Sequence, residues 1–226
     1  MNNPYVPQSQ RDALYSGVQL GRCNGVSIGG AGCFITVAAM IDSHYKGVLI
    51  MPDVINRLAL EQGLYVNGCL YPDEMLTKLV QGLQVAVFNY QNGPADLSKL
   101  EMTDEEECLV VVDFDHDPRD GIQIHALRAF AWDGKNLIVD DPWFGTRENF
   151  TAHYGTNLTQ TIQKIVKYRL PGFVPPWKQP ASPPIVIPVS RQEFDNALAE
   201  IAALKTASET NSEFLQGIKT AWDKVP

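Results

Sequence analysis

Helix-type and strand-type patterns are segregated along the first 170 residues of this chain. Apolar residues at helical spacing come first, in residues 33–45, 51–63 and 71–82. Segments rich in β-branched and aromatic residues follow, at residues 84–90, 108–115, 122–132, 135–141 and 161–170. Helices followed by strands favour an α+β domain, with N-terminal helices packed on an antiparallel sheet, over an alternating α/β domain.

The composition changes after residue 170. Residues 171–188 contain seven prolines, which predicts a stiff, extended linker over residues 171–189. From Ser190 onward, capping-box spacings and apolar residues at helical intervals predict a helical tail over residues 190–226. The sequence thus predicts a domain over residues 1–170, a linker and a helical appendage.

Charge and hydrophobicity exclude several classes of partner. The formal net charge is −8 over 226 residues, and no stripe of Lys and Arg is present to neutralise phosphates, so we expect no nucleic-acid partner. No apolar run approaches the ~18 residues that span a bilayer, so we expect no membrane insertion. The N-terminus lacks the basic and apolar regions of a signal peptide, which predicts synthesis in the cytoplasm. The four cysteines are widely spaced, which predicts four reduced thiols and neither a metal site nor a cofactor.

A glycine-rich turn precedes the first helical pattern. Gly29, Gly30 and Gly32 lie directly before Cys33, the residue at which that pattern begins. Unpaired backbone N–H groups and the helix dipole stabilise a thiolate at such a position, and the glycines leave its approach side open. Taken alone, the position also suits an inert buried cysteine.

A nucleophilic thiolate needs a histidine base that a third polar group orients. His44 lies eleven residues after Cys33 on the same helix, roughly 16 Å away and out of reach. His116 and His153 lie in polar stretches typical of loops. His125 differs because it lies within a strand pattern.

A hairpin closed around Asp133 and Gly134 joins the strand of His125 to the next strand. Counting from this turn, position 125 lies opposite roughly 141 to 142, so Asp141 is expected to reach His125. An ordinary cross-strand polar pair would have the same geometry. With a helix-start cysteine elsewhere in the chain, we favour the catalytic interpretation.

Acyl transfer also requires donors for an oxyanion. The backbone N–H of Cys33 supplies one donor, and an upstream amide side chain is expected to supply the other. Three glutamines are available, and the composition of the sequence does not distinguish between them: Gln8, Gln10 and Gln19.

Four sequence segments together resemble the C39-like cysteine peptidases, a group with a papain-like fold. They are an SQRD opening that ends at Asp12, Gly-Cys-Phe-Ile-Thr from Gly32, the strand from His125 to Asp133-Gly134, and Asp140-Asp141-Pro142. The likeness extends from about residue 5 to residue 170. It implies a papain-like fold with a C-terminal helical appendage.

The resemblance also implies the roles of individual residues. Cys33 would be the nucleophile, His125 the general base and then acid, Asp141 the orienting partner and Gln10 the side-chain oxyanion donor. Three departures from the family pattern lie at the edge of the site, and they put substrate choice in doubt more than activity. They are Tyr15 for a tryptophan, Ile124 for a glycine and Asp140 for an asparagine.

The function that the resemblance implies is that of a hydrolase, a cysteine peptidase (thiol protease) or amidase. A domain of this group without transporter segments points to cell-wall peptides such as peptidoglycan, and the linker and tail point to tethering in a phage virion or lysis protein. An alternative is a structural or adaptor virion protein that retains the fold and works through residues 190–226, by binding a partner or itself. A transglutaminase-type transfer would use the same residues, but no amine-acceptor site is visible.

Overall fold

The protein is described from a computed structural model, which describes residues 6–66, 74–90, 94–117, 123–175 and 178. The predicted tail and most of the predicted linker lie outside the described residues. The helices are α1 (Ile28–Ala31), α2 (Cys33–Lys46), α3 (Pro52–Glu61), α4 (Met75–Leu79), the 3₁₀ turn η1 (Leu97–Leu100), α5 (Thr151–Tyr154) and α6 (Leu158–Thr161). The strands are β1 (Gln84–Tyr90), β2 (Glu106–Asp113), β3 (Ile124–Trp132), β4 (Leu137–Asp141), β5 (Thr146–Asn149) and β6 (Ile162–Arg169).

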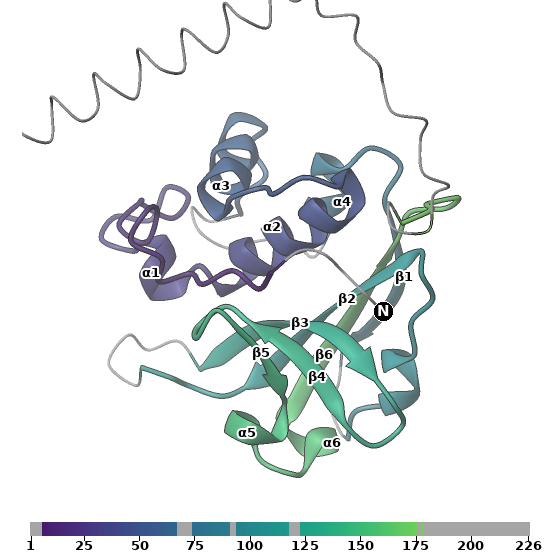
Figure 1. The fold of residues 1–226 in the computed structure, drawn as a ribbon. Coiled ribbons are helices and arrows are strands. Elements are labelled where there is room, and N and C mark those ends of the chain that lie inside the picture. The colour runs from purple at the N-terminus through teal and green to yellow at the C-terminus, as the bar shows by residue number, and fades with distance from the viewer. Residues whose placement is uncertain (1–5, 67–73, 91–93, 118–122, 176–177, 179–226) are drawn as a thin grey trace, which may run out of the picture. The chain divides into compact units, whose positions relative to one another are not determined.

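The strands form one open, six-stranded antiparallel sheet with the order β1-β6-β2-β3-β4-β5. Helices α1 to α4 lie on one side of this sheet, and α5 and α6 lie toward the other (Figure 1). The predicted α+β class is therefore confirmed. Among the described residues, no helix combines the length and the apolar character that a membrane span requires.

Both faces of the sheet are buried around its central strand, β2. Leu109 and Val111 face the core beneath the N-terminal helices, whereas Cys108, Val110 and Val112 face a second core on the opposite side. Because side chains alternate along a strand, an almost continuous apolar run is what a strand covered on both faces requires. This arrangement anchors β2 and β3, from which the candidate site is built.

Helix α2 is buried along nearly its whole length, from Phe34 to Tyr45. Most of its buried residues are apolar, as expected for a helix packed between other elements, and the buried polar ones are Thr36, Asp42, Ser43 and His44. It ends at Gly47, whose φ of 70° gives the left-handed cap that favours glycine. The packing of α2 on β3 fixes Cys33, its first residue, close to the start of that strand.

Several expectations need correction. Cys23 is disulfide-bonded, so the expectation of four reduced thiols is wrong, although Cys33 and Cys108 are free. The third predicted helix is shorter than residues 71–82, although residues 71–73 lie outside the described part of the chain. The short elements β5, α5 and α6 were not expected.

Candidate active site

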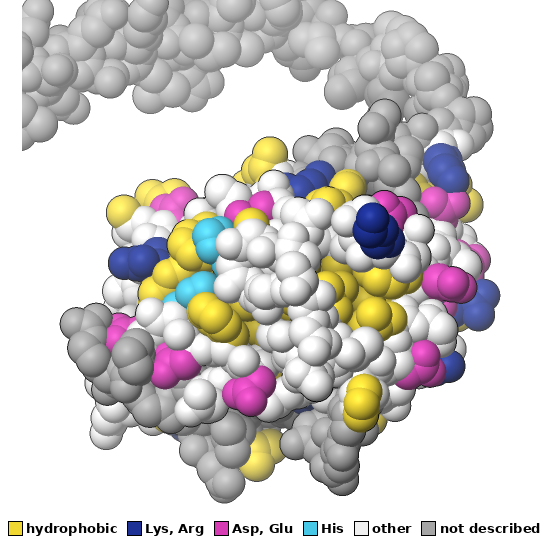
Figure 2. Space-filling view, turned by 90° about the horizontal axis from the view of Figure 1, so that it is seen from below, with side chains coloured by type: hydrophobic (Ala, Val, Ile, Leu, Met, Phe, Trp, Pro, Cys, Tyr) yellow, Lys and Arg dark blue, Asp and Glu magenta, His cyan; other side chains and the backbone are white. Residues whose placement is uncertain are grey.

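Cys33 is a partly exposed residue at the first position of α2. It lines a cavity of about 30 Å³ together with Gln10, His116, His125 and Trp143. The unpaired N–H groups of a helix N-terminus surround the thiol at this position. On the face shown in Figure 2, histidine side chains reach the surface beside apolar ones.

Two of the glycines before Cys33 have a packing role that the sequence analysis did not anticipate. A Cβ atom on Gly32 would lie 2.4 Å from the carbonyl oxygen of Ile28, and one on Gly29 would lie 2.9 Å from Ser16. These contacts are too close for any side chain. Gly32 therefore permits the tight turn between α1 and α2, Gly29 permits the close approach of α1 to Ser16, and Gly30 is the glycine that lines the cavity.

His125 and Asp141 form the predicted contact. The Nε2 atom of His125 lies 3.0 Å from Oδ1 of Asp141, and both side chains are buried. The expected register was inaccurate, because β3 contains a bulge and Arg128 pairs with Asp140. Continuing that register sets Asp141 opposite residue 127, so the two side chains meet diagonally across the strands.

The environment of Cys33 and His125 favours a thiolate–imidazolium pair. Burial opposes ionisation of the thiol, but the hydrogen bond and charge of His125 outweigh it, and the backbone N–H groups of Ala126 and Phe34 add to their effect. Together they hold the pKa of Cys33 below its ordinary value. Burial also opposes protonation of His125, but hydrogen bonds with Asp141 and Cys33 raise its pKa to about 9. Because Nε2 faces Asp141, Nδ1 is the nitrogen left for the thiol.

The carboxylate of Asp141 is held by three donors. Its Oδ1 accepts from Nε2 of His125 and from the backbone N–H of Trp143 at 2.8 Å, and its Oδ2 accepts from the hydroxyl of Tyr154 at 2.5 Å. Burial would raise the pKa of Asp141, but these partners, His125 foremost, lower it overall. The carboxylate is thus kept ionised and fixed in orientation.

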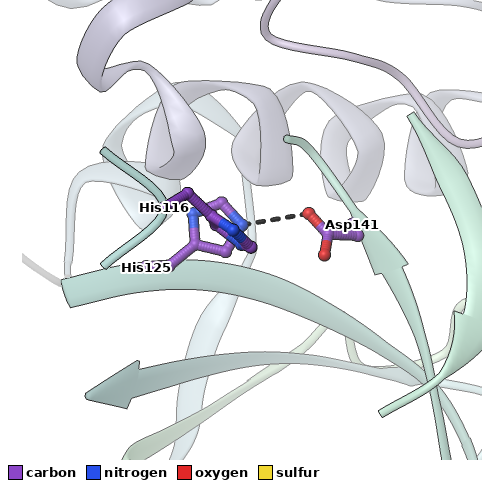
Figure 3. A group of neighbouring side chains, drawn as sticks. All are labelled: His116, His125 and Asp141. Carbon is purple, nitrogen blue, oxygen red and sulfur yellow. Dashed lines mark hydrogen bonds and ion pairs between the residues drawn. The ribbon is translucent and has the colours of Figure 1, made fainter. Parts of the chain in front are cut away.

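His116 belongs to the same cluster. It lies in a loop after β2, as expected from the sequence, but its place at the site was not expected. Its Nε2 lies 2.8 Å from the hydroxyl oxygen of Tyr154, and its ring stacks on Trp143 with a centroid distance of 5.1 Å. Figure 3 shows the rings of His116 and His125 next to one another beside Asp141. Burial, and then the charge of His125, lower the pKa of His116 to about 4, so the ring is neutral near pH 7.

The number of available hydrogens fixes which group is the donor in each of these hydrogen bonds. A tyrosine hydroxyl has one proton, and Tyr154 donates it to Asp141. Nε2 of His116 must therefore carry the hydrogen of its bond with Tyr154. Neither Tyr154 nor His116 carried a recognisable motif, because both reach the site through packing and not through a spaced pattern.

Gln10 is the glutamine that lies at the cavity. Its backbone N–H donates to the carbonyl of Pro142 at 2.7 Å, and its Nε2 donates to the carbonyl of Gly29 at 3.2 Å. An amide nitrogen has two hydrogens, so one orients the side chain and the second is available to a ligand. Gln8, by contrast, directs its Nε2 to the carbonyl of Ile50.

The structure shows where the three residues that depart from the family pattern lie. The hydroxyl of Tyr15 donates to the carbonyl of Ser9 at 2.7 Å and so anchors the segment that contains Gln10. Ile124 is half-exposed and lines the cavity. Asp140 lies on the other face of β4 from Asp141, as adjacent strand residues do.

Asp140 is part of a buried ionic network between α2 and the sheet. Arg128 contacts Asp140 at 2.8 Å and Glu107 at 2.5 Å, and Arg147 contacts Asp140 at 2.6 Å. Nδ1 of His44 lies 3.0 Å from Glu107. Burial opposes ionisation of Glu107, but Arg128, together with His44, lowers its pKa to about 2. This network is structural and accounts for the aspartate at position 140.

Comparisons with protein-family models, with curated proteins and with solved structures each found no match. The resemblance to C39-like peptidases therefore stays a prediction. The elements of the site are an acidified thiol, a basic imidazole, a fixed carboxylate and an oriented amide. Such a set is suited to covalent acyl transfer.

Proposed function

We propose that the protein is a cysteine peptidase or amidase with a papain-like fold. The observation that carries this proposal is the hydrogen bond of 3.0 Å between His125 and Asp141 at the cavity that Cys33 also lines. A thiol, an imidazole and an orienting carboxylate are the groups that nucleophilic acyl transfer requires. The lowered pKa of Cys33 and the raised pKa of His125 support the same assignment.

Acylation would begin from the thiolate of Cys33 and the imidazolium of His125. The thiolate attacks the carbonyl carbon of a peptide or amide bond, and the oxyanion accepts hydrogen bonds from the backbone N–H of Cys33 and from Nε2 of Gln10. As the C–N bond breaks, His125 transfers its Nδ1 proton to the leaving nitrogen. The products are a thioester on Cys33 and a free amine.

Deacylation would use the same imidazole as a base. Neutral His125 takes a proton at Nδ1 from a water molecule, whose oxygen attacks the thioester carbon. Collapse of the second tetrahedral intermediate releases a carboxylic acid and restores the thiolate and the imidazolium. Asp141 would keep Nε2 protonated throughout, so Nδ1 is the nitrogen that exchanges protons.

Cell-wall peptides such as peptidoglycan are the substrates that we propose, with the protein acting in a phage virion or during lysis. The disulfide of Cys23 supports action outside the reducing cytosol, because disulfides persist mainly in oxidising compartments. The alternative is a virion protein that retains this fold and works through residues 190–226. The lowered pKa of Cys33 favours the enzyme, since an inert buried thiol would have a raised pKa, as Cys108 does.

The test is incubation of the full-length protein with purified peptidoglycan and with a library of amide-linked peptides, followed by mass spectrometry of the soluble products. We expect new amine and carboxyl termini with the native protein and none with Cys33→Ala. Cleavage that survives Cys33→Ala would contradict the proposal. Truncation before residue 190 distinguishes the alternative: hydrolysis of a small substrate survives it, whereas binding to a virion assembly is lost.

A further inference from the structure

We propose that His116, His125 and Asp141 form a binding site for a divalent transition-metal ion of the Zn²⁺ class. Each residue offers one ligand atom, and these atoms all lie within 4.8 Å of one another (Figure 3). Two imidazoles and one carboxylate are a donor set that zinc binds in proteins, with a fourth position open to water. Alkaline-earth ions prefer sites made of oxygen ligands, so the two imidazoles favour a transition metal.

The distances require only a small adjustment. Metal–ligand bonds of about 2.0–2.2 Å in a tetrahedron place the ligand atoms roughly 3.3 Å apart. The separation of 3.0 Å between Nε2 of His125 and Oδ1 of Asp141 is already close to this value. The ligand atom of His116 lies within 4.8 Å of the other two, so His116 completes the set by moving inward by at most roughly 1.5 Å. It lies beyond the end of β2, outside the hydrogen-bonded ladder, and its ring stacks on Trp143, so the shift would exchange the hydrogen bond of Nε2 with Tyr154 for the metal and keep the stack.

The surrounding contacts suit metal ligands. Asp141 is oriented by the backbone N–H of Trp143 and by the hydroxyl of Tyr154. Nε2 of His125 is the nitrogen that faces Asp141, so the metal would bind at Nε2 and the remaining hydrogen of this imidazole would be on Nδ1. His116 and His125 both line the cavity, which provides a route of entry for the ion.

Binding of the ion displaces protons from the two histidines. The ion replaces the Nε2 hydrogen of His125, which is released to solvent, and the hydrogen of His116 moves from Nε2 to Nδ1. With the metal on Nε2, His125 cannot become an imidazolium, so it cannot take a proton from the attacking water. The ion would therefore stop deacylation. This inhibition rests on the proposed function, whereas the binding itself does not.

The direct test is titration of the full-length Cys33→Ala protein with ZnCl₂ by isothermal calorimetry. We expect one tight site, a loss of affinity of at least about tenfold on adding His116→Phe, and a change of less than about twofold on adding His153→Phe. Phenylalanine at 116 keeps the stack on Trp143, and His153 is a control because it lies outside the ligand set. Absence of a tight site in Cys33→Ala would overturn the proposal, because the native protein would then bind the ion through the thiol or not at all.

Cobalt substitution tests the same site in the unaltered chain. Co²⁺ at three N/O ligands is expected to give visible ligand-field bands without the strong near-ultraviolet band of a cobalt–thiolate bond. A thiolate band, or binding that His116→Phe and His116→Gln leave undiminished, would refute the assignment. Failure of hydrolysis in the absence of metal would count against the proposed enzyme, whereas failure of Zn²⁺ to bind would count against this site alone.

Discussion

The hydroxyl of Tyr154 is predicted to stabilise the fold through its charged acceptor. In Tyr154→Phe the ring keeps its packing against Phe150 and Phe114, so the change is confined to the two hydrogen bonds of the hydroxyl, the one donated to Asp141 and the one accepted from His116. Hydrogen bonds to charged groups contribute about 1.5–3 kcal/mol, and both residues are buried, so solvent does not weaken the bond. We expect the free energy of unfolding at pH 7 to fall by that amount, as measured by urea denaturation.

The effect of Tyr154→Phe on the free energy of unfolding should also depend on pH. The pKa of Asp141 is depressed in the folded protein, so its contribution is fully present above its unfolded value of about 3.9 and is lost as the pH falls below it. The effect of Tyr154→Phe should therefore be constant from pH 8 to about 5 and shrink in stronger acid.

Tyr45→Phe is the matched control for this substitution. The hydroxyl of Tyr45 shares its one hydrogen between two neutral carbonyl groups, those of Glu105 and Tyr168. Its loss should cost about 0.5–1.5 kcal/mol, and the difference should not change through the carboxylate range. A destabilisation by Tyr154→Phe below about 0.5 kcal/mol, or one as independent of pH as that of the control, would mean that the hydroxyl does not stabilise the fold through a charged carboxylate.

Three further predictions concern catalysis and stability. The pH profile of kcat/KM should be bell-shaped. Its acid limb should lie below the ordinary thiol pKa, because the pKa of Cys33 is lowered, and its alkaline limb should lie near pH 9, where His125 loses its proton. A flat profile from pH 6 to 10 would contradict this assignment. Gln10→Ala should lower kcat by about 10²–10³-fold with little change in KM, as measured in steady-state assays, and an unchanged kcat would remove this residue from the oxyanion site. Arg128→Met leaves the buried Glu107 without its two-pronged arginine partner and removes one of the two arginines that contact Asp140, so it should cost about 3–5 kcal/mol in urea denaturation. Arg169→Met, at an exposed pair, should cost less than about 1 kcal/mol, and equal effects would contradict the role of the buried network.

The fold was predictable where the sequence pattern is strong and continuous. Helix α2 and the strands β1 and β6 lie close to their expected residues, because their apolar residues repeat over two or more turns or pleats. Strand β5, Thr146–Asn149, was missed because it is polar throughout and its pairing with β4 is decided by tertiary context. Helices α5 and α6 have four residues each, too few for a recognisable period.

The candidate site was predictable only in its local part. His125 and Asp141 belong to one hairpin, so counting from the turn was enough to bring them together despite the bulge. His116 and Tyr154 are 38 residues apart, and their contact depends on how separate segments pack over β3. No spacing rule could connect them, and so the sequence analysis found the pair of His125 and Asp141 but not the residues that support it.

The most direct test of the account is the alkylation of Cys33 by limiting iodoacetamide across a pH series, read by peptide mapping in the native protein and in His125→Ala. The thiolate is the reactive form, so the rate reports the pKa of Cys33. We predict that native Cys33 is labelled readily below pH 7, and that in His125→Ala its labelling shifts to the alkaline range of an ordinary thiol. If both proteins show the same pH dependence, Cys33 and His125 are not an activated pair, and the proposed enzyme loses its chemical basis.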